Sequence, residues 1–229
     1  KLLDRTSRPK LRFEAGIAAF LRPPRCTAMA LRLVALAALG AAQATPAPVF
    51  DYTFGANCPF CKEFGTTLKQ LNAADGIAAA VDFNLRAAIR GAAPAWDCPD
   101  EDDGCPMTKY VLCAFSAKKD TQDEVDFMTC WDESTASPAS KAQSCAEQLK
   151  LDWSAISACA GGAEGVALEA AAALTFVTRF PEHKTGRFGV PHIYIGGVEQ
   201  QNHDYQSLLS ALCAAGAKAG ACGGEVVQI

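Results

Sequence analysis

Residues 49–61 read VFDYTFGANCPFC, and this stretch decides the fold. The segment Val49–Phe54 places an aromatic side chain at every second position, a pattern typical of a half-buried strand. Apolar residues then recur at helical spacing over about residues 59–72: Phe60, Phe64, Leu68 and Leu71. The sequence therefore predicts a strand that leads directly into an amphipathic helix, with Cys58 and Cys61 at the junction.

Further strands and helices follow the same pattern rules. Residues 81–86 alternate strictly between apolar and polar, which predicts a second strand. Residues 191–200 predict a hairpin whose turn is Gly196-Gly197. A last helix, capped by Asp204, has one apolar face: Tyr205, Leu208, Leu209 and Leu212. The order strand, helix, strand, then hairpin and helix, predicts an α/β fold.

Between these two parts, residues 98–180 are predicted to form a helical insertion. Two helical stripes indicate it: Met107, Tyr110, Val111, Ala114 and Phe115 in the first, and Val166, Ala170, Leu174 and Val177 in the second. The acidic segment Asp97–Asp103 leads into the insertion and is interpreted as a solvated surface loop rather than a metal site.

The first 44 residues are interpreted as sequence that the mature protein lacks. Residues 29–44 have a basic start, a short apolar centre and an Ala-x-Ala exit, the features of a secretory signal peptide. Their apolar run is shorter than the roughly 20 residues of a membrane span. Residues 1–28 are interpreted as upstream sequence. The predicted mature domain is residues 45–229, in the secretory pathway and without a membrane span after cleavage.

Composition and charge describe a globular protein with an acidic body. Half of the 229 residues are hydrophobic and 20% are charged, which is enough apolar material for a buried core. Residues 1–44 hold eight of the 21 Lys and Arg but two of the 25 Asp and Glu, so the remaining chain has a net charge of −10. An acidic body repels phosphate backbones, which argues against nucleic acid as a partner.

Cysteine is the residue type that stands out. Cleavage after Ala44 would remove Cys26 and leave ten of the eleven cysteines, an even number in an oxidising compartment. Beyond Cys58 and Cys61, eight are predicted to form four structural disulfides: Cys98, Cys105, Cys113, Cys130, Cys145, Cys159, Cys213 and Cys222. The only pairing predicted individually is Cys213–Cys222, which closes a short Gly/Ala-rich loop.

The position of Cys58 predicts a reactive thiol. Free backbone amides and the dipole at a helix N-terminus favour a thiolate, so the pKa of Cys58 is expected to be lowered and its side chain exposed. Cys61, one turn further along, is expected to lie deeper and to resolve a mixed disulfide.

Three alternatives compete with this redox pair. A structural zinc site needs four ligands, but the chain has no second Cys-x-x-Cys, and the histidines, His183, His192 and His203, are scattered in sequence. An inert structural bridge would close too little chain to stabilise much. A redox scaffold that has lost its activity stays open.

Val190 and Pro191 are the second chemical element. In the predicted order of elements, the loop before the hairpin faces the Cys-x-x-Cys pair. A cis Pro191 would present the backbone of Val190 to a substrate strand, whereas an ordinary trans proline would simply begin the strand.

The constellation resembles the thioredoxin superfamily and, more closely, the gamma-interferon-inducible lysosomal thiol reductase (GILT) family. The resemblance covers nearly the whole mature chain and includes the Cys-x-x-Cys pair, the Val190-Pro191 step and the spacing of the other cysteines. The chain departs from the family hallmark at its start, which is Cys-Gln-His-Gly in the family and Cys98-Pro99-Asp100-Glu101 here.

The resemblance implies a thioredoxin-like fold with a disulfide-stapled helical insertion, and an enzyme that reduces protein disulfides. Cys58 would attack, Cys61 would resolve, and Val190 with Pro191 would hold the substrate. It implies no cofactor or metal, an external thiol reductant, disulfide-containing protein substrates, and a lysosomal, endosomal or extracellular location. A secretory-pathway oxidase or isomerase and a non-catalytic disulfide-rich binding module are the alternatives.

Overall fold

A computed structural model describes residues 46–100, 102–118 and 120–223. The predicted upstream segment, residues 1–28, and the predicted signal peptide, residues 29–44, lie outside the described residues. The described residues belong to one compact unit, residues 44–229.

A four-stranded mixed sheet is the centre of this unit, in the order β2-β1-β5-β6. Its strands are β1 (Val49–Phe54), β2 (Asp82–Ala87), β5 (His192–Ile195) and β6 (Val198–Glu199). β1 runs parallel to β2 and antiparallel to β5, and Gly196-Gly197 forms the turn between β5 and β6. Tyr52 of β1 lies between Leu85 and Ile193 in the two neighbouring strands. The α/β arrangement predicted from the sequence is confirmed.

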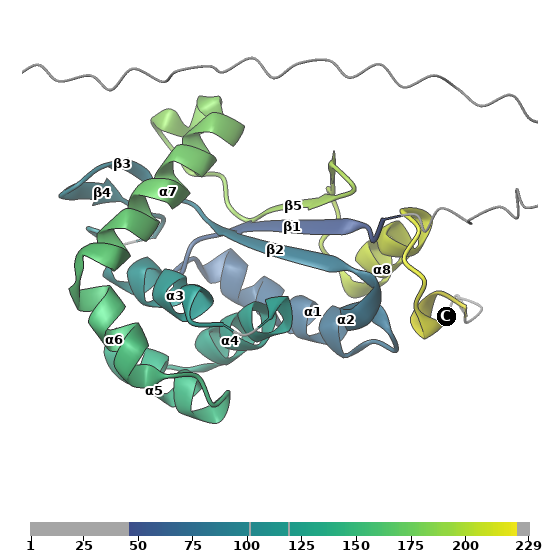
Figure 1. The fold of residues 1–229 in the computed structure, drawn as a ribbon. Helices are drawn as coiled ribbons and strands as arrows, with labels where there is room; N and C mark the ends of the chain where they lie inside the picture. The colour runs from purple at the N-terminus through teal and green to yellow at the C-terminus, as the bar shows by residue number, and fades with distance from the viewer. Residues whose placement is uncertain (1–45, 101, 119, 224–229) are drawn as a thin grey trace, which may run out of the picture. The chain divides into compact units, whose positions relative to one another are not determined.

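The helices that connect these strands position the Cys-x-x-Cys pair. α1 (Pro59–Ala73) and α2 (Ile77–Ala80) link β1 to β2, and α8 (Tyr205–Ala214) follows the hairpin and packs against α1. Asp204 caps α8 by accepting a hydrogen bond from the Ser207 amide at 3.0 Å. In Figure 1, α1, α3 and α4 lie on the same side of β1 and β2.

The insertion contains five helices: α3 (Pro106–Ser116), α4 (Thr121–Glu133), α5 (Pro138–Gln148), α6 (Trp153–Gly161) and α7 (Ala163–Arg179). A small hairpin that the sequence did not predict precedes it, formed by β3 (Arg90–Ala92) and β4 (Ala95–Asp97). Two 3-10 turns, η1 (Pro181–Lys184) and η2 (Gly220–Cys222), complete the elements of the described chain. No single described helix is long and apolar enough to cross a membrane, and the one pair that passes together, α6 with α7, bends by 75°.

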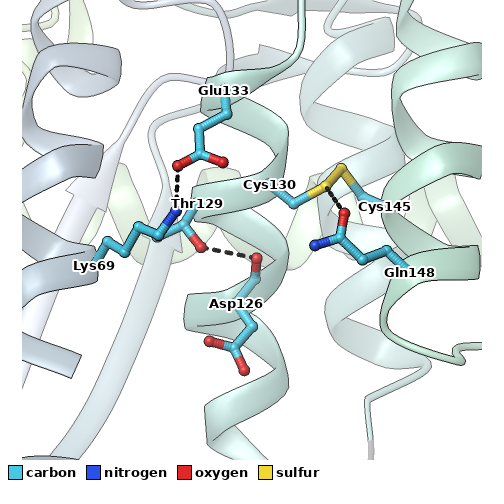
Figure 2. A network of polar contacts seen from close by, with 7 residues as sticks. All are labelled: Lys69, Asp126, Thr129, Cys130, Glu133, Cys145 and Gln148. Atoms are coloured by element: carbon cyan, nitrogen blue, oxygen red, sulfur yellow. Dashed lines mark hydrogen bonds and ion pairs between the residues drawn. A yellow bond between two sulfur atoms is a disulfide. The ribbon is translucent and has the colours of Figure 1, made fainter. Parts of the chain in front are cut away.

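Disulfides connect the helices of the insertion. Cys113 of α3 is bonded to Cys159 of α6, and Cys130 of α4 to Cys145 of α5. Figure 2 shows the second bridge beside the ion pair of Lys69 in α1 with Glu133 in α4, at 2.5 Å. The other bridges are Cys98–Cys105 and Cys213–Cys222.

The predicted apolar face of α7 is wrong. Val166 is 39% exposed and Leu174 is 69% exposed. The helix instead buries Gly165, Glu169, Ala173 and Phe176. Glu169 is fully buried because Lys109 of α3 forms an ion pair with it at 3.1 Å, so a carboxylate occupies the packed face.

The acidic segment before α3 is also not wholly solvated. Asp102 is fully buried. Its carboxylate accepts hydrogen bonds from the backbone amides of Met107 at 2.8 Å and Thr108 at 2.9 Å, and from the Thr108 hydroxyl at 2.7 Å. Asp102 therefore satisfies free amides at the start of α3, which is a structural role.

Candidate active site at the start of helix α1

Cys58 is the residue that begins α1. It takes the N-cap position, with Pro59 in the first turn, and its sulfur accepts a hydrogen bond from the Cys61 backbone amide at 3.3 Å. An N-cap side chain normally satisfies one of the free amides of the first turn, and here a thiol does so. The local sequence Cys58-Pro59 thus both starts the helix and directs a donor at the sulfur.

The two thiols are free and differ in acidity. The pKa of Cys58 is lowered, mainly by a hydrogen bond from the Cys61 side chain and further by the Cys61 amide, while burial opposes the shift. Burial raises the pKa of Cys61, and the neighbouring Cys58 raises it further. Since only a thiolate attacks a disulfide, Cys58 is the better nucleophile of the pair.

The expected exposure of Cys58 is wrong. Cys58 is 2% exposed and Cys61 is 1% exposed. Two loops close over the start of α1. Pro99 packs so tightly on Gly55 that a Cβ there would lie 2.8 Å from the proline ring, and on the other side the Cys58 sulfur lies 3.9 Å from the Val190 carbonyl oxygen.

The Val190 carbonyl oxygen lies 3.9 Å from the Cys58 sulfur, and Pro191 follows Val190 directly before β5. The peptide bond between them is cis. Thr53 of β1 pairs with His192, the residue that follows Pro191, so the sheet itself holds this loop next to the end of β1. The three elements that meet here are therefore the end of β1, the start of α1 and the start of β5.

Contacts behind Cys61 are features that the sequence analysis missed. The Tyr52 hydroxyl donates to the Cys61 carbonyl at 3.3 Å, and the Gly55 amide donates to the Cys61 sulfur at 3.4 Å. Trp131 of α4 donates its indole N–H to the Ala56 carbonyl at 2.8 Å. Trp131 lies 75 residues after Ala56 in the sequence, and no local pattern predicts its role. The insertion thus supports the loop that leads into the Cys-x-x-Cys pair.

Phe60, whose side chain is 67% exposed, lines two grooves. The first, called here the Asp100 groove, has a volume of about 720 Å³ and is also lined by residues 99–100 and 187–190. The second has a volume of about 340 Å³ and lies along Phe64, Pro191 and His203.

The histidines are less scattered in space than in sequence. His183 and His192 lie with ring centroids 5.2 Å apart, and His192 stacks on Phe180 at 4.3 Å. In the described part of the chain, no three His, Cys, Asp or Glu side chains gather in a way that could hold a metal ion.

Comparison with known proteins identifies the fold. No family model and no curated protein matches the chain. A solved structure of a candidate protein disulfide isomerase from Nitrosomonas europaea is similar over 74% of this chain and 97% of its own, with 11% identity and a TM-score of 0.51. A thioredoxin-like oxidoreductase from Silicibacter pomeroyi is 14% identical over 73% of this chain and 86% of its own, with a TM-score of 0.48. DsbA from Xylella fastidiosa is 19% identical over 72% of this chain and 81% of its own, with a TM-score of 0.45.

At such identities a similarity concerns the fold alone. The mixed sheet, with a helix that starts at Cys58 and with the Val190 carbonyl next to the Cys58 sulfur, matches the fold that the sequence resemblance implied. Between β4 and β5 lie five helices, and disulfides join α3 to α6 and α4 to α5. The chain has a thioredoxin-like fold with a disulfide-stapled helical insertion.

Proposed function

We propose that this protein is a thiol-disulfide oxidoreductase that reduces protein disulfides through Cys58 and Cys61. The observation that carries the proposal is the split between the two thiols at the start of α1. The Cys58 sulfur accepts a hydrogen bond from the Cys61 backbone amide, and the pKa of Cys58 is lowered. The pKa of Cys61 is raised, mainly by burial. A structural pair of cysteines has no need of this difference.

The split fits a two-step exchange. The Cys58 thiolate attacks one sulfur of the substrate disulfide, a Cys58–substrate bond forms, and the other substrate sulfur leaves as a thiolate that takes up a proton. Cys61 then loses its proton and attacks the Cys58 sulfur, which releases the second substrate thiol and leaves a Cys58–Cys61 disulfide. An external thiol must return this disulfide to the dithiol.

The timing of the second step follows from the same electrostatics. The negative charge on Cys58 is one of the causes that raise the pKa of Cys61. Once Cys58 is part of a mixed disulfide, that charge is gone, so Cys61 loses its proton more readily at the moment when it is needed. In this proposal, the Val190 carbonyl and Pro191 hold the substrate backbone beside the reacting sulfurs.

One observation favours the opposite direction, oxidation of substrate thiols. The hydrogen bonds to the Cys58 sulfur stabilise the reduced pair, and a stabilised reduced form makes a dithiol–disulfide couple more oxidising. The reduction potential of the Cys58–Cys61 pair, measured by equilibration with glutathione buffers, distinguishes a reductase from an oxidase. A potential well below that of the glutathione pool supports a reductase, and one well above it supports an oxidase or isomerase.

The cellular location of this activity is also part of the proposal. The resemblance to the GILT family and the four disulfides favour an oxidising compartment of the secretory pathway, with a lysosomal, endosomal or extracellular location. An insulin-reduction assay from pH 4 to 8 tests the function. A rate no higher than the background of the added thiol would instead support a binding module without turnover.

A further inference from the structure

The loop closed by the Cys98–Cys105 disulfide, residues 98–105, brings a carboxylate to the active site. Its backbone is fixed at Asp100, where φ is +59° and the Asn57 side-chain amide donates to the Asp100 carbonyl at 2.5 Å. Pro99 packs on Gly55, the residue that follows β1. These contacts and the disulfide hold Asp100 beside Cys58 rather than leaving it free on the surface.

Asp100 and Arg187 both line the Asp100 groove. No described residue forms a salt bridge with either of them. Val190, whose carbonyl oxygen lies 3.9 Å from the Cys58 sulfur, lines the same groove. A substrate that reaches Cys58 through this groove therefore passes one negative and one positive side chain.

Of these two charges, Asp100 acts on the reacting sulfur. The Cys61 side chain and amide lower the pKa of Cys58, and Asp100 opposes them through its charge and through a hydrogen-bonding interaction with the thiol. Arg187 is not among the main causes of the shift in the pKa of Cys58. The field at the sulfur is thus more negative than the helix start alone would make it, and a positive charge on an approaching substrate would offset it.

We propose that Asp100 selects substrates by charge, so that Cys58 reacts preferentially with disulfides that carry a positive group next to the attacked sulfur. In a protein substrate this group would be a Lys or Arg adjacent to the attacked cysteine. The inference rests on the proposed function, because it assumes that Cys58 is the attacking thiol. It adds a specificity-determining residue from a loop outside the Cys-x-x-Cys pair.

Three small disulfides of different charge test the proposal: cystamine, which is positive, dithiodipropionate, which is negative, and bis(2-hydroxyethyl) disulfide, which is neutral. The full chain carries Cys61→Ser, so that each attack stops at the mixed disulfide. In each reaction the Cys58 thiolate bonds to one reagent sulfur, the reagent S–S bond breaks, and the other half leaves as a thiolate that takes up a proton. Mass spectrometry gives the rate at Cys58.

The measured quantity is the ratio of the cystamine rate to the dithiodipropionate rate. Asp100→Asn also changes the thiolate fraction of Cys58, but this affects both reagents and cancels in the ratio. Asn tolerates the left-handed backbone at position 100, so the loop keeps its shape. Asp103→Asn is the matched control, since Asp103 is an exposed acid of the same loop that does not line the groove.

We expect the ratio to exceed one and to fall about three- to ten-fold in Asp100→Asn, and to change little in Asp103→Asn. Raising the salt concentration should reduce the ratio in the Asp100 protein and hardly affect it in the Asn variant, a response that a purely structural role would not produce. An unchanged ratio in Asp100→Asn, with normal reaction of the neutral reagent, overturns this inference alone. Failure of Cys58 to react even with the neutral disulfide overturns the proposed function and the inference with it.

Discussion

Helices α1 and α3 both begin with Cys-Pro, at Cys58-Pro59 and Cys105-Pro106, yet the two cysteines have different surroundings. In α1 the N-cap sulfur itself accepts a backbone amide of the first turn. In α3 the buried carboxylate of Asp102 accepts hydrogen bonds from the first-turn amides, and the Cys105 sulfur forms a disulfide with Cys98. The same Cys-Pro sequence therefore starts both helices, but only Cys58 is a free thiol that receives a backbone amide, whereas Cys105 is held in a disulfide.

The largest expected effect is at the first of these helix starts. Cys58→Ser should reduce the insulin-reduction rate to the background of the added thiol, because the attacking sulfur is gone. Serine is a good N-cap residue, so α1 should still begin at position 59 and the circular dichroism spectrum should be preserved. Retained activity, or a collapsed fold, would remove Cys58 from the role of nucleophile.

Cys61→Ser should stop the reaction halfway. The attacking thiolate and the N-cap contact to the residue-61 amide remain, but the group that displaces the substrate is missing. Covalent adducts with substrate proteins should accumulate as high-mass bands that disappear on reduction, and they should be absent when Cys58 is also replaced. If acid-quenched samples contain no more adduct than wild type, the two cysteines are not an attacking and resolving pair.

At the start of α3 the expected effect is on stability rather than on chemistry. Asp102→Ala removes three hydrogen bonds at a fully buried position and leaves two backbone amides unsatisfied, so we expect a loss of about 2–4 kcal/mol in the free energy of unfolding. Asp120→Ala is the matched control, because Asp120 caps α4 at an exposed position and should cost about 1 kcal/mol. Equal losses in urea titrations would mean that Asp102 does not hold the start of α3.

The two helix starts also show which features of the fold can be predicted from the sequence. Periodicity predicted β1, α1, β2 and the β5–β6 hairpin, since each is set by its own residues. The sequence predicts a solvated Asp102, because five acids in seven residues normally face water. Only the folded loop shows that Asp102 caps α3. The burial of Cys58 could not be predicted either, because Pro99 and Val190, which cover it, are distant in sequence.

The same reason accounts for the wrong face of α7. Its hydrophobic pattern favoured Val166 and Leu174 as buried residues. The packed face is instead built around Glu169, whose partner Lys109 belongs to α3. A charge that is neutralised by another element carries no local signal, so patterns of single helices misplace it.

Asp132 of α4 offers an effect that appears only as a pH dependence, and a contrast with Asp102. Both carboxylates are buried, but Asp132 Oδ2 has no hydrogen-bond partner among the described residues and lies against Gly65 of α1, where an added Cβ would approach it to 2.7 Å. Burial raises the pKa of Asp132 from 3.8 to about 7. Lys141 and Lys62 act in the opposite direction, and Glu133 adds to the rise. The protonated form is therefore the one that the folded protein prefers.

The sign of the pH dependence follows from this direction. Because the pKa is higher in the folded than in the unfolded chain, Asp132 contributes stability that is complete below about pH 4 and is lost as the pH rises to about 7. Asp132→Asn cannot titrate, so the difference in unfolding free energy between pH 4 and pH 8 should change by about 3–4 kcal/mol relative to wild type, with wild type losing more on the alkaline side. Any constant cost of the buried amide is the same at both pH values and cancels, as do all other titrating groups. Urea titrations of the two proteins at pH 4, 6 and 8 measure this difference, and parallel pH profiles would show that the Asp132 carboxylate titrates alike in the folded and unfolded chains.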